Sequence, residues 1–347
     1  MTPENTQLTT ASSILARATT QLSASPDLRD SAARDALTLL LHTLGVTRAQ
    51  FHANPDRALT PEQQVVYEAF IARRLANEPI QYITGEQEFY GLTLRVTPAV
   101  LIPRPETEHL VEAVLMGLSN HQKEAVIPSE GRFSGRSRGT PAFALRILDV
   151  GTGSGAIAIA LAHHLPHAHV TATDISPAAL AIARENAARH RLSDRIDFLE
   201  SDLLDSLTEE RETQEAALTR AARREQYEVP REAHRERYEV SRAARRERYE
   251  VLVSNPPYVP ASDRQTLHPQ VRDHEPSAAL FAGADGLAIY RRLIPQARAA
   301  LVPNGLLALE IGHGQHDAIA ALLSGWNAVR FIDDLQSIPR VALARRP

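Results

Sequence analysis

The sequence predicts an α/β fold in which a small helical domain precedes a doubly wound domain. Three observations carry this prediction. Apolar residues recur at three- and four-residue spacing through residues 1–78, as they do in amphipathic helices. From Arg146 onward, short apolar strands alternate with helical segments, which is typical of a parallel sheet with helices on both faces. A glycine-rich segment follows the first of these strands, where such folds place a ligand-binding turn.

The helical part is expected to contain helices over residues 10–22, 31–44 and 61–75. Thr60 is a favourable N-cap for the third helix, because proline follows it and a glutamine stands three residues after it. Pro79 ends this helical region. The alternating stretch 89–100 predicts a β-hairpin. We therefore expect a helical domain over 1–80, a hairpin connector over 81–105 and the α/β domain over 106–347.

The α/β domain is expected to alternate strands and helices from its first strand to its last. The expected strands are 147–150, 169–173, 196–199, 251–253, 306–311 and 329–332. The expected helices are 155–165, 177–190, 287–301 and 316–323. Helices of this length between strands favour parallel neighbours.

Two segments interrupt this alternation, at residues 119–143 and 209–248, and we interpret both as flexible insertions. In the second, one sequence pattern recurs with a period of eleven, at 221–229, 232–240 and 243–251. Eleven residues complete three helical turns, so the repeat places tyrosine and valine on one stripe. We interpret 209–250 as a solvated, partly helical insertion, with a partner-binding element as the alternative.

The composition is that of a globular protein, with 43% hydrophobic and 23% charged residues. Cysteine is absent, which excludes disulfides, thiolate metal sites and a cysteine nucleophile. No apolar run approaches the roughly 20 residues of a membrane-spanning helix, and the N-terminus shows no export signal. We expect a cytoplasmic protein with no membrane contact. The net charge of −4 argues against a chain-wide basic surface for nucleic acid.

The first motif with chemical meaning is the loop after the first strand, which contains Gly151, Thr152, Gly153, Ser154 and Gly155. Glycines here let the backbone turn tightly and approach a ligand closely. The spacing differs from the dinucleotide pattern, because an alanine stands at position 156. Asp174 closes the second strand about twenty residues on, where a carboxylate can accept hydrogen bonds from ribose hydroxyls; the alternative role is that of a helix N-terminal acid.

The second motif is the tetrapeptide that follows the fourth strand, Asn255, Pro256, Pro257 and Tyr258. If the first and fourth strands are neighbours, it faces the glycine loop across the crevice where such sheets bind ligands. An amide nitrogen is a poor nucleophile because its lone pair is delocalised. The Asn255 side-chain oxygen and the Pro256 carbonyl can accept its two N–H bonds and so orient it. Tyr258 can stack on the planar amide.

These two motifs together resemble the amino-methyltransferases, which modify adenine or cytosine amines or glutamine amides. Further stretches resemble the release factor glutamine methyltransferases (the HemK/PrmC family). They are 100–108 (Val-Leu-Ile-Pro-Arg-Pro-Glu-Thr-Glu), 275–290, which contains Asp285-Gly286-Leu287, and 310–315, which begins Glu310-Ile311-Gly312. The resemblance implies a Rossmann-like class I methyltransferase domain, S-adenosylmethionine as cofactor and a class I peptide-chain release factor as protein substrate. It also implies that the helical domain binds that substrate.

The resemblance also assigns residues. Residues 151–155 match the family's cofactor loop, Asp174 its ribose-binding acid and 255–258 its substrate-amide site, with Asn255 also close to the cofactor. Asp202 and Leu203 match positions near the adenine, although the family often has an aromatic residue where Leu203 stands. Arg104 and Glu106 border the site without an assigned role; a structural salt bridge is the alternative. Residues 334–340 lack a glycine that the family has.

The reaction expected from the resemblance is methylation of the glutamine side-chain nitrogen, N5, in the glycine-glycine-glutamine motif of the release factor. A nucleic-acid adenine-N6 methyltransferase is the alternative, since a flipped base presents the same planar amine to Asn-Pro-Pro-Tyr. No direct nucleic-acid binding is expected, because the only arginine-dense stretch is the acid-balanced repeat. A non-catalytic scaffold would need a degenerate site. No metal is expected, because the 14 histidines are scattered.

Overall fold

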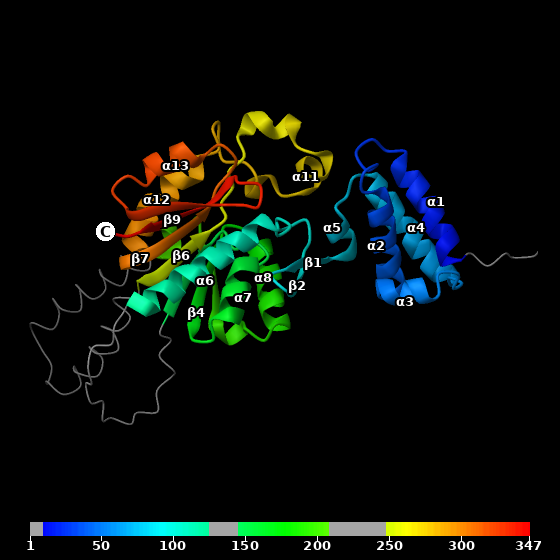
Figure 1. Ribbon diagram of the computed structural model, residues 1–347, viewed down its shortest axis with the longest axis horizontal. Coiled ribbons are helices and arrows are strands. Elements are labelled where there is room, and N and C mark those ends of the chain that lie inside the picture. Colours follow the sequence, from blue (N-terminus) through cyan, green and yellow to red (C-terminus); the bar gives the residue numbers. More distant parts are fainter. Residues whose placement is uncertain (1–9, 125–144, 208–247) are drawn as a thin grey trace, which may run out of the picture. The chain divides into compact units, whose positions relative to one another are not determined.

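The computed structural model describes residues 10–124, 145–207 and 248–347 (Figure 1). These residues form two compact units. The N-terminal unit comprises Met1–Gln87, Val96–Ile102 and Ser262–Ser277, and the sheet unit comprises Glu88–Arg95, Pro103–Ala261 and Ala278–Pro347. Residues 208–247, which contain all of the repeat except the end of its third copy, and most of the 119–143 segment lie outside the described residues. No helix among the described residues is both long and apolar enough to cross a bilayer.

The N-terminal unit is helical, as expected. Its helices are α1 (Ala11–Ser23), α2 (Ala32–Leu44), α3 (Arg48–Ala53), α4 (Pro61–Leu75) and α5 (Ile80–Thr84). The predicted start of α4 is confirmed. The Thr60 N–H donates to Gln63 Oε1 at 3.1 Å, and the Gln63 N–H donates to Thr60 Oγ1 at 3.2 Å. Apolar side chains such as Ile14, Leu39 and Tyr67 form one core. The short helices α3 and α5 were not expected.

A segment distant in sequence also belongs to the N-terminal unit. Ser262–Ser277 contains the 3-10 helix η2 (Ala261–Thr266) in large part, and α11 (Pro269–His274). His268 Nε2 lies 3.2 Å from the Asp27 carbonyl oxygen, and His274 Nε2 lies 3.0 Å from that of Ala76. The Ile102 N–H donates to the Glu275 carboxylate at 3.4 Å. The unit is therefore assembled from three stretches of chain.

The predicted hairpin lies earlier than residues 89–100. Its strands are β1 (Glu86–Phe89) and β2 (Leu92–Arg95). The turn is formed by Tyr90 and Gly91, whose φ values are 52° and 76°, so Gly91 belongs to the turn and not to a strand. The expected loop at 119–143 also begins too early, because α6 (Glu106–Glu124) is helical to residue 124.

The sheet unit contains seven strands. They are β3 (Leu145–Val150), β4 (Ala168–Asp174), β5 (Ile196–Glu200), β6 (Tyr249–Ser254), β7 (Leu301–Glu310), β8 (Asn327–Asp333) and β9 (Pro339–Arg345), in the order β5-β4-β3-β6-β7-β9-β8. The expectation of an all-parallel sheet is wrong at one strand. β9 was not expected, and it pairs antiparallel with both β7 and β8, because the tight turn 334–338 reverses the chain after β8.

Helices cover both faces of the sheet, as expected (Figure 1). α6 and α7 (Ala156–His164), with the end of α8 (Pro177–Arg189), share one apolar core with the sheet. α12 (Ala288–Ala300) and α13 (His316–Leu322) share the other. Alternate strand residues enter the two cores: Ile147 lies in the first and Leu148 in the second. Residues 156–162 of α7 are buried around the whole helix, so this helix anchors the loop that precedes it.

Candidate functional site

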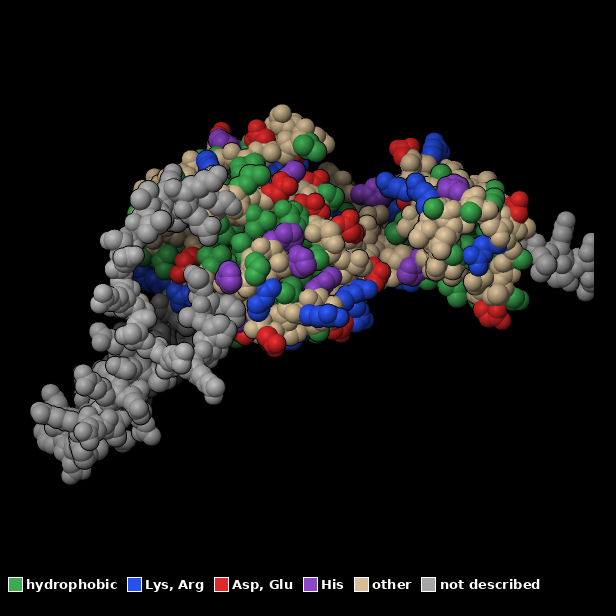
Figure 2. Space-filling view, turned by 60° about the horizontal axis from the view of Figure 1, so that its bottom comes forward, with side chains coloured by type: hydrophobic (Ala, Val, Ile, Leu, Met, Phe, Trp, Pro, Cys, Tyr) green, Lys and Arg blue, Asp and Glu red, His purple; other side chains and the backbone are tan. Residues whose placement is uncertain are grey.

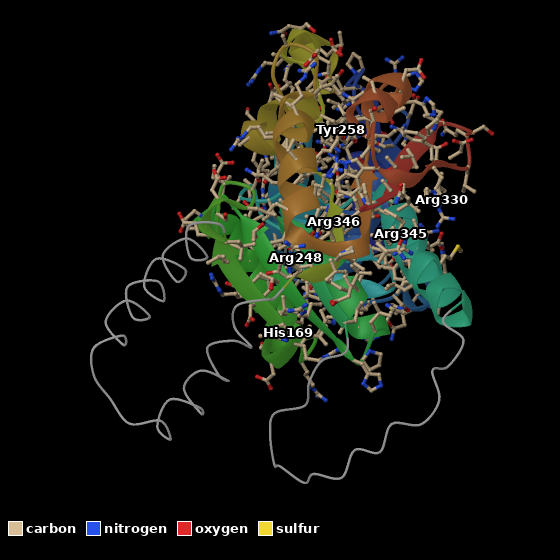
Figure 3. The ribbon with its side chains drawn as sticks, turned by 90° about the vertical axis from the view of Figure 1, so that its left-hand side faces the viewer. His169, Arg248, Tyr258, Arg330, Arg345 and Arg346 are labelled. Carbon is tan, nitrogen blue, oxygen red and sulfur yellow. The ribbon has the colours of Figure 1, made fainter. Side chains whose placement is uncertain are left out.

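The two predicted motifs leave neighbouring strands at the same end of the sheet. β3 and β6 are parallel neighbours, and Val150 is the register partner of Ser254. The Ser254 hydroxyl donates to the Val150 carbonyl at 2.6 Å. Strand order reverses here, since β4 and β5 lie beyond β3 while β7 lies beyond β6, and open α/β sheets bind ligands at this point. Figure 3 shows Tyr258 at one end of the unit and His169, at the start of β4, at the other.

The glycine loop has a conformation that other residues rarely adopt. Its glycines Gly151, Gly153 and Gly155 have φ values of 75°, 55° and 84°. A Cβ on Gly155 would lie 3.0 Å from Ile159 Cδ1, so glycine permits close packing of the loop on α7. Around Gly151 and Gly153 an added Cβ would meet nothing within 4 Å. The outer side of the loop is therefore open to a ligand.

The Asp149 carboxylate, at the end of β3, holds this loop by hydrogen bonds. Its Oδ2 accepts from the Thr152 hydroxyl at 2.7 Å and from the Ala158 N–H at 3.2 Å. Burial raises the pKa of Asp149 to about 7, against the opposing effect of these two hydrogen bonds. Its Oδ1 is buried without a hydrogen-bond partner among the described residues. Thr152 and Ser154 are themselves buried, and the Thr152 hydroxyl is used within the loop by Asp149.

Asp174 lies beside the loop at the end of β4. Its Oδ2 accepts from the Gly153 N–H and its Oδ1 from the Ser176 N–H, both at 2.9 Å. Burial raises the pKa of Asp174, and these backbone bonds oppose the rise. The carboxylate also receives a backbone hydrogen bond from Ile175, and since its two oxygens can accept about four hydrogen bonds in all, capacity for a further donor remains. The contact with Ser176 at the start of α8 corresponds to the alternative role, and it leaves the ribose role open.

Asp202 and Leu203 lie in the segment that follows β5, and their contacts are with α12 and the core that contains it. Asp202 is half-exposed and forms an ion pair with Arg292 at 2.7 Å. Leu203 is partly buried against the core that contains α12, and its φ of 53° is rare for a leucine. Its side chain offers an apolar contact only.

Tyr258 lies in a close-fitting cradle. The Gln315 amide nitrogen donates to the Tyr258 carbonyl at 3.0 Å, and its oxygen accepts from the Gly312 N–H at 2.9 Å. A Cβ on Gly312 would lie 3.0 Å from Tyr258 Cδ2, and one on Gly286 would clash with the Tyr258 carbonyl oxygen. Glycine at both positions therefore lets the tetrapeptide sit where it does. These residues belong to the stretches that carried the family resemblance, which gave them no role.

Asn255 is held by a residue that the sequence did not single out. Its Nδ2 donates to the Thr107 hydroxyl oxygen at 3.0 Å, and Thr107 is buried in the first turn of α6. The Asn255 Oδ1 has no hydrogen-bond donor among the residues that the structure describes. The signal that could have found Thr107 was its place in the stretch 100–108.

A buried carboxylate lies behind both side chains. Glu310, at the end of β7, accepts from the Tyr258 hydroxyl at 3.4 Å. Burial raises the pKa of Glu310 to about 7, while hydrogen bonds from Thr107 and Tyr258 lower it. Burial also raises the pKa of Tyr258 far above its usual value, with a smaller rise from Glu310. The Tyr258 hydroxyl is therefore neutral, and it donates to Glu310 as the Thr107 hydroxyl does.

Arg104 and Glu106 lie near enough to Tyr258 to affect the pKa of its hydroxyl. Arg104 lowers the pKa of Tyr258 and Glu106 raises it, so both act electrostatically on the tyrosine. Neither effect assigns a chemical role. Among the described residues, no group of three or more histidine, aspartate or glutamate side chains could hold a metal ion.

Comparison with known proteins identifies both parts of the chain. Residues 13–85 match the model of the PrmC N-terminal domain, and residues 147–243 match a methyltransferase domain. The release factor glutamine methyltransferase of Koribacter versatilis is 39% identical over 89% of this chain and 89% of its own. Those of Moorella thermoacetica and Geobacter sulfurreducens are 38% and 36% identical, over 85% and 82% of this chain and 84% and 79% of theirs. This chain belongs to the family of release factor glutamine methyltransferases.

Proposed function

We propose that this chain transfers a methyl group from S-adenosylmethionine to N5 of the glutamine in the glycine-glycine-glutamine motif of a class I peptide-chain release factor. The observation that carries the proposal is the pairing of the glycine loop and Asn255–Tyr258 on the adjacent strands β3 and β6. Its products are N5-methylglutamine and S-adenosylhomocysteine. The helical domain over 1–80 would bind the rest of the release factor, which implies a cytoplasmic place of action.

The residues present suit S-adenosylmethionine. Gly151 and Gly153 leave open space on the outer side of the loop, so residues 151–155 can pass close to the ligand's methionine part. Asp174 has lone pairs for ribose hydroxyls, and Asp202 and Leu203 would lie toward the adenine. When bound, S-adenosylmethionine supplies a methyl group activated by its positively charged sulfur.

Asn255 and Pro256 would orient the glutamine amide. The Asn255 Oδ1 and the Pro256 carbonyl accept one N–H bond each, which turns the lone-pair face of the nitrogen toward the methyl group. Pro256 and Pro257 stiffen the backbone, so the acceptors are in place before the substrate arrives. Tyr258 stacks on the amide plane. The N-methylated amide is strongly acidic before it loses its proton, so water suffices as the final proton acceptor.

The alternative, methylation of adenine N6 in a nucleic acid, has less support. Such an enzyme needs a basic surface that follows the phosphate backbone. On the face shown in Figure 2, basic and acidic side chains of the described residues are interspersed. Several arginines of the sheet unit are paired, including Arg291 with Asp285 and Arg292 with Asp202. The release factor therefore remains the preferred substrate.

Mass spectrometry of a recombinant class I release factor, incubated with this protein and S-adenosylmethionine, tests the proposal. We expect one added methyl group on the glutamine of the glycine-glycine-glutamine motif. Asn255→Ala should abolish it, whereas Asn327→Ala, which truncates an exposed asparagine at the start of β8, should leave it unchanged. Methyl transfer to DNA or RNA, with none to the release factor, would reject the proposed substrate.

A further inference from the structure

The proposed function requires that the oxygen of the Asn255 side chain, and not its nitrogen, faces the substrate. The two ends of an asparagine amide are nearly equal in shape but opposite in hydrogen-bonding character. The substrate nitrogen presents two N–H donors. A flipped Asn255 would oppose them with two more donors, and the site would lose one of its two acceptors.

We propose that Thr107 and Glu310 are positioning residues that hold the Asn255 amide in its productive orientation, through a hydrogen-bond relay from Asn255 Nδ2 to the Thr107 hydroxyl and on to the Glu310 carboxylate. This inference rests on the proposed function, because it assigns the free Asn255 oxygen to the substrate amide. Thr107 belongs to α6, Asn255 follows β6 and Glu310 ends β7, so the relay joins three elements of the sheet unit.

The relay has a direction because each member has limited hydrogen-bonding choices. An ionised Glu310 can only accept. The Thr107 hydroxyl has a single proton, and its hydrogen bond to Glu310 commits that proton. The Thr107 oxygen can then only accept from Asn255, which selects Nδ2 at 3.0 Å and excludes Oδ1. A flipped amide would set two acceptor oxygens against each other inside the protein.

Glu310 also acts on the second side chain of the site. The Tyr258 hydroxyl donates to it at 3.4 Å, so one carboxylate receives hydroxyl groups from both Tyr258 and Thr107. Its other oxygen, Oε2, is buried without a partner among the described residues. The Tyr290 hydroxyl bonds the Glu310 backbone carbonyl at 2.7 Å, not the side chain. The carboxylate thus accepts from Tyr258, which stacks on the substrate amide, and from Thr107, which holds Asn255.

Protonation of Glu310 should weaken the relay. A neutral carboxyl carries a proton of its own and can donate it to Thr107, which frees the threonine proton to point at Asn255. The charged and titratable groups that interact with Glu310 are Glu106 on α6, Arg340 on β9, Tyr258, and Tyr290 on α12. Since burial raises the pKa of Glu310 to about 7, the weakening should occur at mildly acidic pH.

The decisive experiment compares Thr107→Val, which removes the hydroxyl from a side chain of the same shape, with Thr107→Ser, which keeps it. The readouts are kcat and KM for release factor methylation and the Kd for S-adenosylmethionine by calorimetry. Thr107→Val should lower kcat roughly 10- to 100-fold, with KM and Kd within about threefold of wild type. This loss is smaller than the roughly 100- to 1,000-fold that follows removal of a donor at the reacting group itself, because Thr107 acts through Asn255. Thr107→Ser should restore kcat to within about threefold.

Thr171→Val is the matched control. Thr171 is a partly buried threonine in the middle of β4, and its Oγ1 accepts from the Tyr249 hydroxyl at 3.2 Å. The same substitution there removes a hydrogen-bonded hydroxyl from the sheet unit but not from the relay, so kcat should not change. The pH profile adds a readout that a merely structural role would not move: kcat of the wild type should fall below about pH 7, and Glu310→Gln should have a lower kcat without that fall.

The outcomes separate the two proposals. If the wild type does not methylate the release factor, the proposed function fails and this inference fails with it. If the wild type does so but Thr107→Val retains its kcat, or Thr107→Ser is as impaired as Thr107→Val, only the relay is overturned. Thermal unfolding of each variant distinguishes a folded protein with low kcat from a protein that has lost its structure.

Discussion

Gly286→Ala tests whether the cradle around Tyr258 is needed for activity. Gly286 has a φ of 75°. A Cβ there would lie 2.8 Å from Gln315 Nε2 and closer still to the Tyr258 carbonyl oxygen. Real Cβ atoms essentially never approach a heavy atom within 3.0 Å. The carbonyl that Gln315 holds in place must therefore move, and Asn255 and Pro256 lie just before it in the chain.

Two costs add in this variant. The left-handed backbone costs an L-residue about 1–2 kcal/mol, and forced overpacking typically costs about 1–3 kcal/mol more. Together they predict a loss of about 2–5 kcal/mol of unfolding free energy. A shift of roughly 1 Å at a reacting group can lower a rate about 100-fold, so we expect kcat to fall about 10- to 100-fold.

Gly314→Ala separates the two costs. Gly314 has a φ of 76°, and a Cβ there would meet nothing within 4 Å. This variant should lose only the conformational cost, about 1–2 kcal/mol, and keep its kcat. Urea unfolding followed by circular dichroism and the release factor methylation rate are the two assays. Equal losses in the two variants, or a Gly286→Ala enzyme with wild-type kcat, would refute the steric argument.

Three further perturbations have defined expectations. Ser337, in the turn between β8 and β9, has a φ of 59°, so Ser337→Gly should relieve about 1–2 kcal/mol of strain and lose about 0.4–1 kcal/mol to unfolded-chain entropy. The net expectation is a gain of about 0–1.6 kcal/mol in urea unfolding, and a loss would contradict it. The pKa of Glu310 is raised from 4.5 to about 7, so the stability that this carboxyl contributes is fully present below about pH 4.5 and is lost as pH rises through 7. Relative to wild type, Glu310→Gln should therefore gain about 3 kcal/mol in unfolding free energy between pH 4.5 and 8. Parallel stability–pH curves of the two proteins would show that the carboxyl does not titrate this way. Asp35 and Arg74 form a buried ion pair at 2.9 Å. Asp35→Ala should therefore lower the unfolding free energy by about 3–5 kcal/mol, because it leaves the buried Arg74 charge unpaired, and adding Arg74→Met should recover most of this loss. A double variant no more stable than the single one would argue against this cause.

Much of the fold could be predicted because many of its helices and strands have signals in their own local sequence. The third predicted helix begins at the capping box of Thr60, where the structure also starts it. The strands around the two motifs are continuous apolar runs, which buried parallel strands require. β9 was missed because a short apolar segment after a turn carries no periodic signal of its own. The hairpin was displaced because its turn uses Tyr90 at positive φ, and tyrosine is not a turn residue.

The candidate site was predictable where its residues are contiguous in sequence. The glycine loop and Asn255–Tyr258 are such segments, and the sheet brings them to neighbouring strand ends. Thr107, Glu310 and Gln315 could not be assigned roles from sequence, because the hydrogen bonds that join them to Asn255 and Tyr258 span 148, 52 and 57 positions. Such contacts depend on packing that no local pattern encodes. Buried carboxylates such as Glu310 look like ordinary acids until the core closes around them.

The three-part make-up of the N-terminal unit has a consequence for synthesis of the chain. His268 and His274, in the last part of the unit, contact the backbone at Asp27 and Ala76. The preceding part of the unit ends at Ile102 and the last part ends at Ser277. The last part is therefore complete only 277 − 102 = 175 residues later in synthesis. At about 5–20 residues per second, that interval lasts roughly 9–35 s. The first helices can pack on one another during this time, but the unit becomes complete only after most of the sheet has been translated. Completion of the two units during synthesis is therefore coupled, although the chain begins with one and ends with the other.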